Sequence, residues 1–293
     1  MERLKSGEVL TADGAMGSLL IERGLPTGDC PERWNLDHPE VLEEIARLYA
    51  EAGAQIVQTN TFGGSPLKLS HYGLDICTEQ INVTAVRAVR KAVSADVLVS
   101  ASCGPTGRML KPYGDVEPEE ISAAFERQLK AILAEGVDMI CIETMMDLGE
   151  ATLAVQAARS VSTTIPIAAT MTFDLTKHGF FTVMGVTIEQ AAIALAEAGA
   201  DIVGSNCGNG IDNMVAIAEE FHKHSNQPIL IQSNAGLPEM VDNQIVYRET
   251  PEFMAARVPR LLESGVGIIG GCCGTTPAHI TALRTAIKQH RTG

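Results

Sequence analysis

One short pattern recurs along this chain and limits the folds that the chain can adopt. Residues 50–57 read Ala-Glu-Ala-Gly-Ala-Gln-Ile-Val and residues 196–203 read Ala-Glu-Ala-Gly-Ala-Asp-Ile-Val, with looser copies at 134–140 and 263–269. Each copy joins the end of a helix, a glycine suited to the left-handed C′ position and a short apolar run typical of a buried strand. The pattern therefore predicts repeated helix-to-strand units that place their strands in a parallel sheet.

The whole chain divides into units of this kind. Short apolar runs predict strands at residues 9–12, 56–59, 97–101, 139–143, 167–172, 202–206, 229–233 and 267–270, and amphipathic segments predict helices at 39–52, 78–93, 117–134, 188–198 and 251–262. Eight such units are typical of an α/β protein of the (β/α)8 TIM-barrel class, in a single domain that spans residues 1–293. A doubly wound open sheet is the alternative, but no Gly-x-Gly-x-x-Gly turn follows the first strand.

Composition excludes several classes of partner. The net charge of −14 argues against nucleic acid or an anionic membrane. No apolar run reaches the length of a membrane span, and the first residues do not resemble a signal peptide. The seven cysteines have no regular spacing, which indicates reduced thiols rather than a disulfide framework. These features predict a cytoplasmic protein.

Two adjacent cysteines, Cys272 and Cys273, follow the last apolar run and lie between glycines. Vicinal cysteines are strained as a disulfide, but both can bind one soft cation where glycines let the backbone bend. Cys207 has a matching context, Gly204-Ser205-Asn206-Cys207-Gly208. Three thiolates predict a zinc site with a fourth position open for chemistry. The remaining cysteines are expected to be packing residues: Cys30, Cys77, Cys103 and Cys141.

Polar residues follow nearly every predicted strand, at the end of a barrel where active sites lie. The carboxylates directly at strand ends are Asp13 and Glu143, and Asn60 and Thr61 follow the second strand. Asn234 follows the strand between the two cysteine segments. It is either a weak, displaceable fourth zinc ligand or a hydrogen-bonding turn residue.

A zinc ion with three thiolates is a poor Lewis acid for activating water, because the site carries a net negative charge. It is suited to binding another thiol as a nucleophilic thiolate. This chemistry predicts transfer of a carbon group to a substrate thiol. Two other classes remain open. One is a metal-free lyase or aldolase with Glu143 or Asp13 as base, although no lysine lies at a strand end. The other is a non-enzymatic zinc- or thiol-binding protein.

Four segments, at residues 13–17, 58–62, 204–208 and 270–277, resemble the signature blocks of the homocysteine S-methyltransferase family, and the resemblance covers roughly residues 8–288. It implies a zinc-bearing barrel that methylates homocysteine to methionine. By motif, the zinc ligands would be Cys207, Cys272 and Cys273.

The resemblance also suggests roles for the other polar residues. Asp13 and Glu143 would hold the ammonium of homocysteine, and Asn60 and Thr61 would complete a polar floor. Residues 58–65 look most like the cobalamin-dependent methionine synthase branch. In that branch the donor is methylcobalamin on another domain, so a corrinoid protein or domain is the expected partner. A betaine or sulfonium donor remains open, as does a corrinoid-linked demethylase that acts on another small methylated compound.

Overall fold

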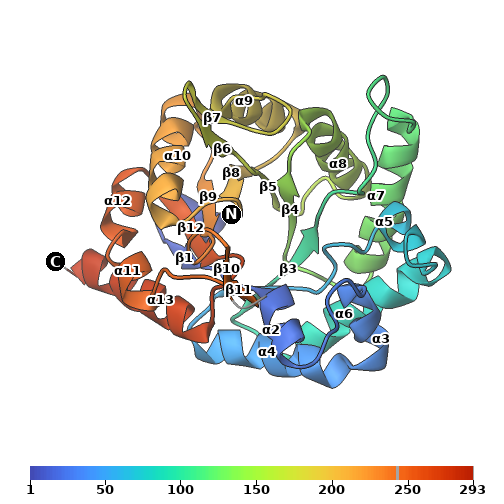
Figure 1. Ribbon diagram of the computed structural model, residues 1–293, viewed down its shortest axis with the longest axis horizontal. Coiled ribbons are helices and arrows are strands. Elements are labelled where there is room, and N and C mark those ends of the chain that lie inside the picture. The colour runs from blue at the N-terminus through green and yellow to red at the C-terminus, as the bar shows by residue number, and fades with distance from the viewer. Residues whose placement is uncertain (242–243, 293) are drawn as a thin grey trace.

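The computed structural model describes residues 1–241 and 244–292. Its centre is a barrel of eight parallel strands surrounded by helices (Figure 1). In chain order the barrel strands are β1 (Leu10–Thr11), β2 (Ile56–Gln58), β3 (Leu98–Cys103), β4 (Met139–Met145), β5 (Ile167–Met171), β8 (Ile202–Asn206), β9 (Ile229–Ser233) and β12 (Val266–Gly271). A parallel bridge between Ala12 and Ile56 joins β1 to β2 and brings the two edges of the sheet together. The (β/α)8 prediction is confirmed.

The outer layer consists of helices that run back between successive strands. They are α4 (Pro39–Glu51), α6 (Thr78–Ala92), α7 (Pro118–Leu133), α8 (Leu148–Val161), α9 (Ile188–Ala198), α10 (Ile211–His224), α12 (Val258–Glu263) and α13 (Pro277–Thr292). Several have clear start signals, such as the capping box between Thr187 and Gln190 in α9. The glycines of the repeated pattern adopt the left-handed conformation where these helices end, with φ of 99° at Gly53 and 111° at Gly199.

The interior of the barrel changes in character along its axis. At the N-terminal end of the strands it is apolar, and every barrel strand contributes to this layer: Leu10, Ile56, Leu98, Met139, Ala168, Ile202, Leu230 and Ile268. Leu4, in the short helix α1 (Glu2–Lys5), and Met1, which precedes that helix, pack against this layer. Burying one large aliphatic side chain in this way contributes about 1.5–3 kcal/mol. The inward positions nearer the C-terminal ends of the strands are mostly polar. The barrel is therefore closed by an apolar core at the N-terminal end and lined by polar side chains at the C-terminal end, which we call the polar cup.

The structure departs from the predicted elements in two respects. The expected helix at 251–262 is two helices, α11 (Pro251–Ala255) and α12. Pro259 lies in the first turn of α12, where its missing N–H is tolerated, and it has no N–H to donate to the carbonyl of Ala255, the last residue of α11.

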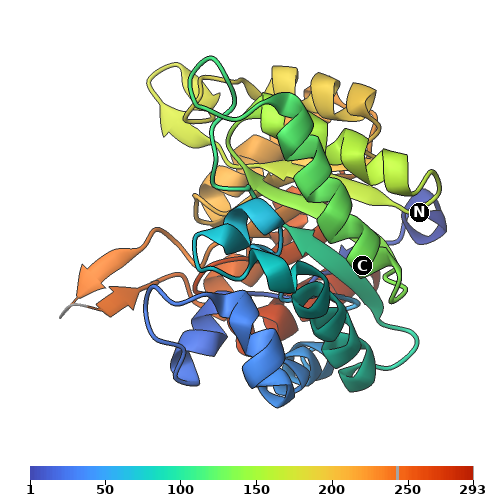
Figure 2. The ribbon, with the colours of Figure 1, turned by 90° about the vertical axis from the view of Figure 1, so that its right-hand side faces the viewer.

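Two antiparallel hairpins were also not predicted. These are β6–β7 (Asp174–Thr176, Gly179–Phe181) and β10–β11 (Glu239–Val241, Gln244–Val246). Their strands are three residues long, and β6 and β10 are exposed throughout, so they carry no burial pattern. Both hairpins project from the same end of the barrel, opposite the N-terminal helix (Figure 2).

Candidate metal and substrate site

The three predicted cysteine ligands meet at the end of the barrel from which the hairpins project. Cys207 follows β8, and Cys272 and Cys273 follow β12, so the two segments are separated by β9. The sulfur atoms of all three lie within 4.8 Å of one another, and Cys207 Sγ lies 3.8 Å from Cys273 Sγ. Within the described residues this is the one group of at least three metal-ligating side chains.

The thiols share their protons unequally. Hydrogen bonds from Cys207 and Cys272 lower the pKa of Cys273 to about 3, because they stabilise its thiolate. Hydrogen bonding to Cys207 raises the pKa of Cys272 well above its ordinary value. These shifts favour the thiolate form of Cys273 and the protonated form of Cys272. A bound cation would replace those protons.

Glu143 lies at the end of β4 and is almost entirely buried. Its Oε1 accepts hydrogen bonds from the Ser102 hydroxyl and from Gln58 Nε2, the latter at 3.1 Å. Burial is the main cause that raises the pKa of Glu143 to about 7, and the nearby Cys207 thiol adds to the shift. Glu143 is therefore poised between its two protonation states near neutral pH.

Asp13 follows β1 and is 1% exposed. Its Oδ2 accepts the backbone N–H of Gln58 at 2.7 Å, whereas Oδ1 has no hydrogen-bond partner among the described residues. Burial raises the pKa of Asp13 to about 8, and Glu143 contributes to the shift. A buried carboxyl with a free oxygen is a ready acceptor for a cationic ligand.

A cavity of about 330 Å³ connects these groups. Its wall includes Asp13, Asn60, Glu143 and the three cysteines, so the structure brings six of the eight predicted site residues together. Thr61 does not line the cavity, because its hydroxyl donates to the Ser102 carbonyl at 2.7 Å within the barrel wall. Asn60 lines the cavity, but its Nδ2 is bonded to the Pro31 carbonyl and to Asn35 Oδ1, both at 2.8 Å.

Asn234 is also outside the cavity wall. It is 3% exposed, and its Oδ1 has no hydrogen-bond partner in the described part of the chain. The next residue, Ala235, donates its N–H to the Cys273 carbonyl at 3.0 Å. An unpaired buried amide oxygen thus lies one residue from the backbone that holds the thiol cluster.

Sequence reasoning missed four polar residues of the cup: Gln58, Ser102, Asn206 and Gln232. Gln58 Oε1 lies 3.4 Å from Gln232 Nε2, which extends the network around Glu143 across the barrel. These residues could have been found from the sequence, because side chains two positions apart along a strand point to the same face. Ile56 and Leu230 point into the barrel, so residues two positions later do so as well. Reading the inward face of each strand would have identified these residues.

The four remaining cysteines pack as predicted. Cys103 and Cys141 are buried in the barrel walls, and Cys30 and Cys77 belong to a small apolar cluster with Leu69 and Ile81.

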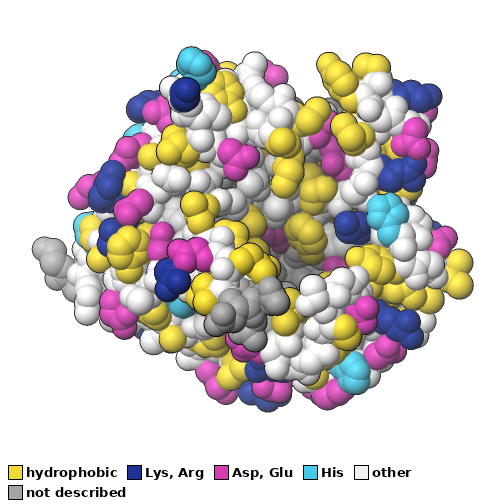
Figure 3. Space-filling view, in the orientation of Figure 1, with side chains coloured by type: hydrophobic (Ala, Val, Ile, Leu, Met, Phe, Trp, Pro, Cys, Tyr) yellow, Lys and Arg dark blue, Asp and Glu magenta, His cyan; other side chains and the backbone are white. Residues whose placement is uncertain are grey.

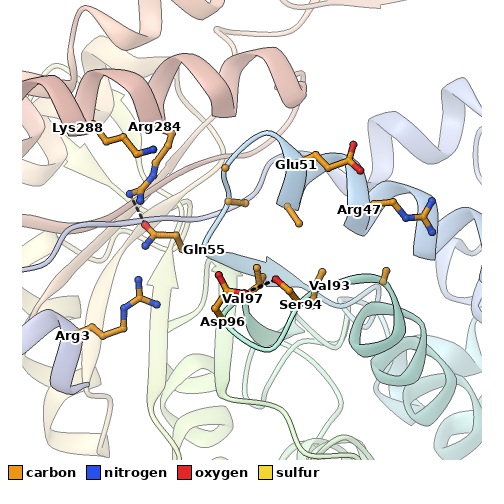
Figure 4. Close-up of a pocket in the computed structure, with 14 residues that line it drawn as sticks. Arg3, Arg47, Glu51, Gln55, Val93, Ser94, Asp96, Val97, Arg284 and Lys288 are labelled. Atoms are coloured by element: carbon orange, nitrogen blue, oxygen red, sulfur yellow. Dashed lines mark hydrogen bonds between the residues drawn. The ribbon is translucent and has the colours of Figure 1, made fainter.

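A second, larger cavity of about 620 Å³ lies at the opposite end of the barrel, between α1, α13 and the loops that precede β2 and β3 (Figure 4). Arg3, Arg284 and Lys288 line it, together with Gln55 and Asp96. Arg284 donates to Gln55 Oε1 at 2.6 Å, and Asp96 accepts from the Ser94 hydroxyl. It contains no cysteine, and we place the chemistry at the smaller cavity because the thiols and the buried carboxyls lie there.

Comparison with known proteins agrees with this geometry. The family model described as Homocysteine S-methyltransferase matches residues 10–287. The methionine synthases of Mycobacterium tuberculosis and Mycobacterium leprae are 33% and 32% identical to this chain, over 97% of its length. The chain spans about a quarter (25%) of the length of these relatives.

Solved structures share the fold. The homocysteine methyltransferase MmuM from Escherichia coli, in its metallated form, superposes with a TM-score of 0.79 over 96% of this chain and 97% of that one, at 24% identity. Its apo form gives a TM-score of 0.76 at 23% identity. Within the described residues, no helix has the length and apolarity needed to cross a membrane.

The fold and the site together define a class, that of (β/α)8 barrels with clustered thiols at the C-terminal ends of the strands. Within that class, the chain belongs to the homocysteine S-methyltransferase family.

Proposed function

We propose that this protein is a zinc-dependent methyltransferase that moves a methyl group onto the thiol of homocysteine and forms methionine. The observation that carries the proposal is the meeting of three thiols and two buried carboxyls, Asp13 and Glu143, in one cavity. The thiols match the reacting sulfur, and the carboxyls match the ammonium of an amino acid. A metal-free lyase would leave the thiol cluster without a role.

The thiol cluster fits zinc on its own geometry. Tetrahedral zinc with metal–sulfur bonds of about 2.3 Å separates its sulfur ligands by about 3.8 Å, and the Cys207–Cys273 distance is 3.8 Å. Cys207, Cys272 and Cys273 would hold the ion, and the unpaired Oδ1 of Asn234 is our candidate for a displaceable fourth ligand. When bound, zinc would keep the substrate thiol deprotonated at neutral pH.

The carboxyl groups would orient the substrate. Asp13 and Glu143 accept the ammonium, with Asp13 using the Oδ1 that has no other partner in the described residues. This holds the sulfur at the cluster and limits the approach of the donor to one direction. The substrate thiolate then attacks the methyl carbon, a carbon–sulfur bond forms, and the bond to the donor breaks with its electron pair left on the donor. No general base is needed.

The walls of the cavity favour a donor that is not a small cation. Betaine and sulfonium compounds are bound well by aromatic faces, but among the described residues Phe62 is the single aromatic one in the cavity wall. Trp34 lies in α3 (Trp34–Asp37) and does not line the cavity. Its ring is tilted by 57° against that of His38, with 4.7 Å between the centroids.

The surface around the cavity supports a donor carried by a protein. Among the described residues, every large exposed apolar side chain except Ile193 lies between the end of a barrel strand and the outer helix that follows that strand. On this face of the molecule, hydrophobic side chains lie around the hollow at its centre (Figure 3). We call the members on the second hairpin, Met240, Val241 and Ile245, the hairpin rim. Such a surface suits docking of a methylcobalamin-bearing domain or protein.

The experiment is to load the protein with zinc and supply homocysteine with methylcobalamin, betaine or S-methylmethionine in turn. We expect methionine with methylcobalamin. Methionine from betaine or S-methylmethionine alone would keep the reaction and replace the donor. Stoichiometric zinc and homocysteine binding without methionine from any donor, even with a methylated corrinoid protein, would favour a thiol-binding protein instead. We also propose a cytoplasmic location, because none of the seven cysteines forms a disulfide.

A further inference from the structure

Asn206 contacts both Glu143 and Cys272 of the site, although it does not line the cavity. It is the last residue of β8, directly before Cys207, and is fully buried. Its Oδ1 accepts hydrogen bonds from the backbone N–H of Thr144 and the hydroxyl of Thr170, each at 2.7 Å. Its Nδ2 donates to the Thr144 hydroxyl at 2.8 Å. The carboxamide thus connects β8 to β4 and β5.

The orientation of this carboxamide follows from its partners. A backbone N–H can only donate, so the atom that faces Thr144 N must be the oxygen. The amide nitrogen therefore points the other way, where it lies 3.3 Å from Glu143 Oε2 and 3.9 Å from Cys272 Sγ. One N–H of this amide is donated to the Thr144 hydroxyl. The other faces both the Glu143 carboxylate, which is proposed to hold the substrate, and the sulfur of Cys272, a proposed zinc ligand.

Backbone strain surrounds Asn206 on two sides. Thr144 has φ of 59° and Cys207 has φ of 60°, and they are the positive-φ residues other than glycine in the described chain. This left-handed conformation costs about 1–2 kcal/mol per residue and is unusual for a β-branched side chain. Such residues persist where their surroundings fix them, often at functional sites. Asn206 bonds to the backbone of Thr144 and precedes Cys207, so it is in a position to fix both.

We infer that Asn206 is a positioning residue that couples the carboxylate of Glu143 to the thiolate of Cys272. The inference rests on the function proposed above. Ser102 and Gln58 hold Oε1 of Glu143, and Asn206 holds Oε2, so together they fix the plane of the carboxylate. The same amide nitrogen faces the sulfur of Cys272, which would be a thiolate with zinc bound, and there an N–H stabilises negative charge. Substrate orientation and thiolate charge are thereby set by one side chain.

The variant Asn206→Asp tests the donor function of the carboxamide separately from its acceptor function. Aspartate keeps the oxygen that accepts from Thr144 and Thr170, but it loses the N–H groups that face Glu143 and Cys272. Asn206→Leu has similar size and adds no charge. The matched control is Asn82→Asp, because Asn82 is a fully buried amide in α6 whose Nδ2 donates to the carbonyls of Gly64 and Thr78.

The test uses the protein loaded with Co²⁺, a spectroscopic substitute for zinc. Loss of the N–H donor raises the energy of the sulfur electrons, so we expect the thiolate-to-cobalt charge-transfer band to move to longer wavelength in both Asn206 variants. We also expect homocysteine affinity to fall about ten- to one-hundredfold. Loss of cobalt from a folded Asn206 variant, with full cobalt in Asn82→Asp, would support the same coupling. An unchanged band and affinity would overturn the inference.

A double-mutant cycle tests whether Asn206 acts on the substrate through Glu143. In a Glu143→Gln background we expect Asn206→Asp to lower homocysteine affinity by less than about threefold. A full loss in that background would overturn the coupling. The proposed function fails separately, since in that case the wild-type protein itself would give no thiolate–cobalt band or no homocysteine binding.

Discussion

The sulfur atoms of Cys207 and Cys273 lie 3.8 Å apart although 66 positions separate the residues in the chain. Cys207 follows β8 and Cys273 follows β12, and β9 lies between these strands in the barrel. The distance is thus set by the closure of the barrel, not by local sequence. A metal bound there should need the fold, whereas the fold should not need the metal.

This relationship predicts the result of removing one thiol. Cys272→Ala or Cys207→Ala should abolish zinc retention and methyl transfer, because two thiolates hold the ion far more weakly than three. The apolar layer lies at the other end of the barrel, so the far-ultraviolet circular dichroism should not change. Cys103→Ala, which removes a buried core thiol from the last residue of β3, should retain full zinc. A loss of helicity in Cys272→Ala would contradict this separation of fold and site.

Glu143→Gln should keep zinc and weaken homocysteine binding. A charge-assisted hydrogen bond to the substrate ammonium is worth about 2–3 kcal/mol, which calorimetry would detect as a large rise in the dissociation constant. Glu150→Gln is the matched control, because Glu150 is also buried but its Oε1 is bonded to Thr106, away from the cavity. Equal affinity in the wild type and Glu143→Gln would remove Glu143 from the substrate site.

Homocysteine binding should depend on pH through Asp13 and Glu143, whose pKa values are raised to about 8 and about 7. Both carboxyls are largely protonated at pH 6, whereas the substrate ammonium binds their ionised forms. Affinity should therefore increase from pH 6 to 8, and binding should release protons. Methionine carries the same ammonium but no thiol proton, so its binding isolates the carboxyl contribution.

Calorimetry of methionine in buffers of different ionisation enthalpy measures this release. We expect proton release near pH 7 in the wild type and less in Asp13→Asn. Proton uptake on binding, or an affinity that does not vary between pH 6 and 8, would show that these carboxyls do not hold the ammonium.

The hairpin rim should matter for a protein-borne donor and not for a free one. Met240→Glu and Ile245→Glu place charge on side chains that are 69% and 62% exposed. We expect methyl transfer from a corrinoid protein to slow about tenfold, since burying an unpaired charge at an interface is costly. Transfer from free methylcobalamin should not change. Ile193→Glu, on the exposed side of α9, should leave both rates unchanged. Equal slowing with both donors would argue against docking.

Much of this architecture was predictable because the chain repeats one local unit. The glycines after four of the outer helices and the two-sided apolar strands specify the barrel, and the barrel places Cys207 beside Cys272 and Cys273. The projecting hairpins were not predictable, because strands such as Glu239–Val241 are exposed and carry no burial period. The break before α12 depends on Pro259, which the amphipathic pattern conceals.

The site was predicted less completely than the fold. Cysteine spacing and strand ends identified the thiols and both carboxyls, but the side chains that orient them needed the structure. The role of Asn206 depends on which way its amide points, and this depends on a backbone N–H contributed by Thr144, 62 positions earlier in the chain. Thr61, at a strand end, has its hydroxyl bonded within the wall.

The most direct test of the account is the sulfur coordination of the bound zinc, measured by X-ray absorption at the zinc edge before and after homocysteine is added. The account predicts one zinc per chain, with three sulfur ligands and one oxygen or nitrogen ligand in the free protein. It predicts four sulfur ligands after homocysteine is added. Three sulfur ligands in both states would contradict binding of the substrate thiol to the metal, and absence of zinc would remove the basis of the proposed function.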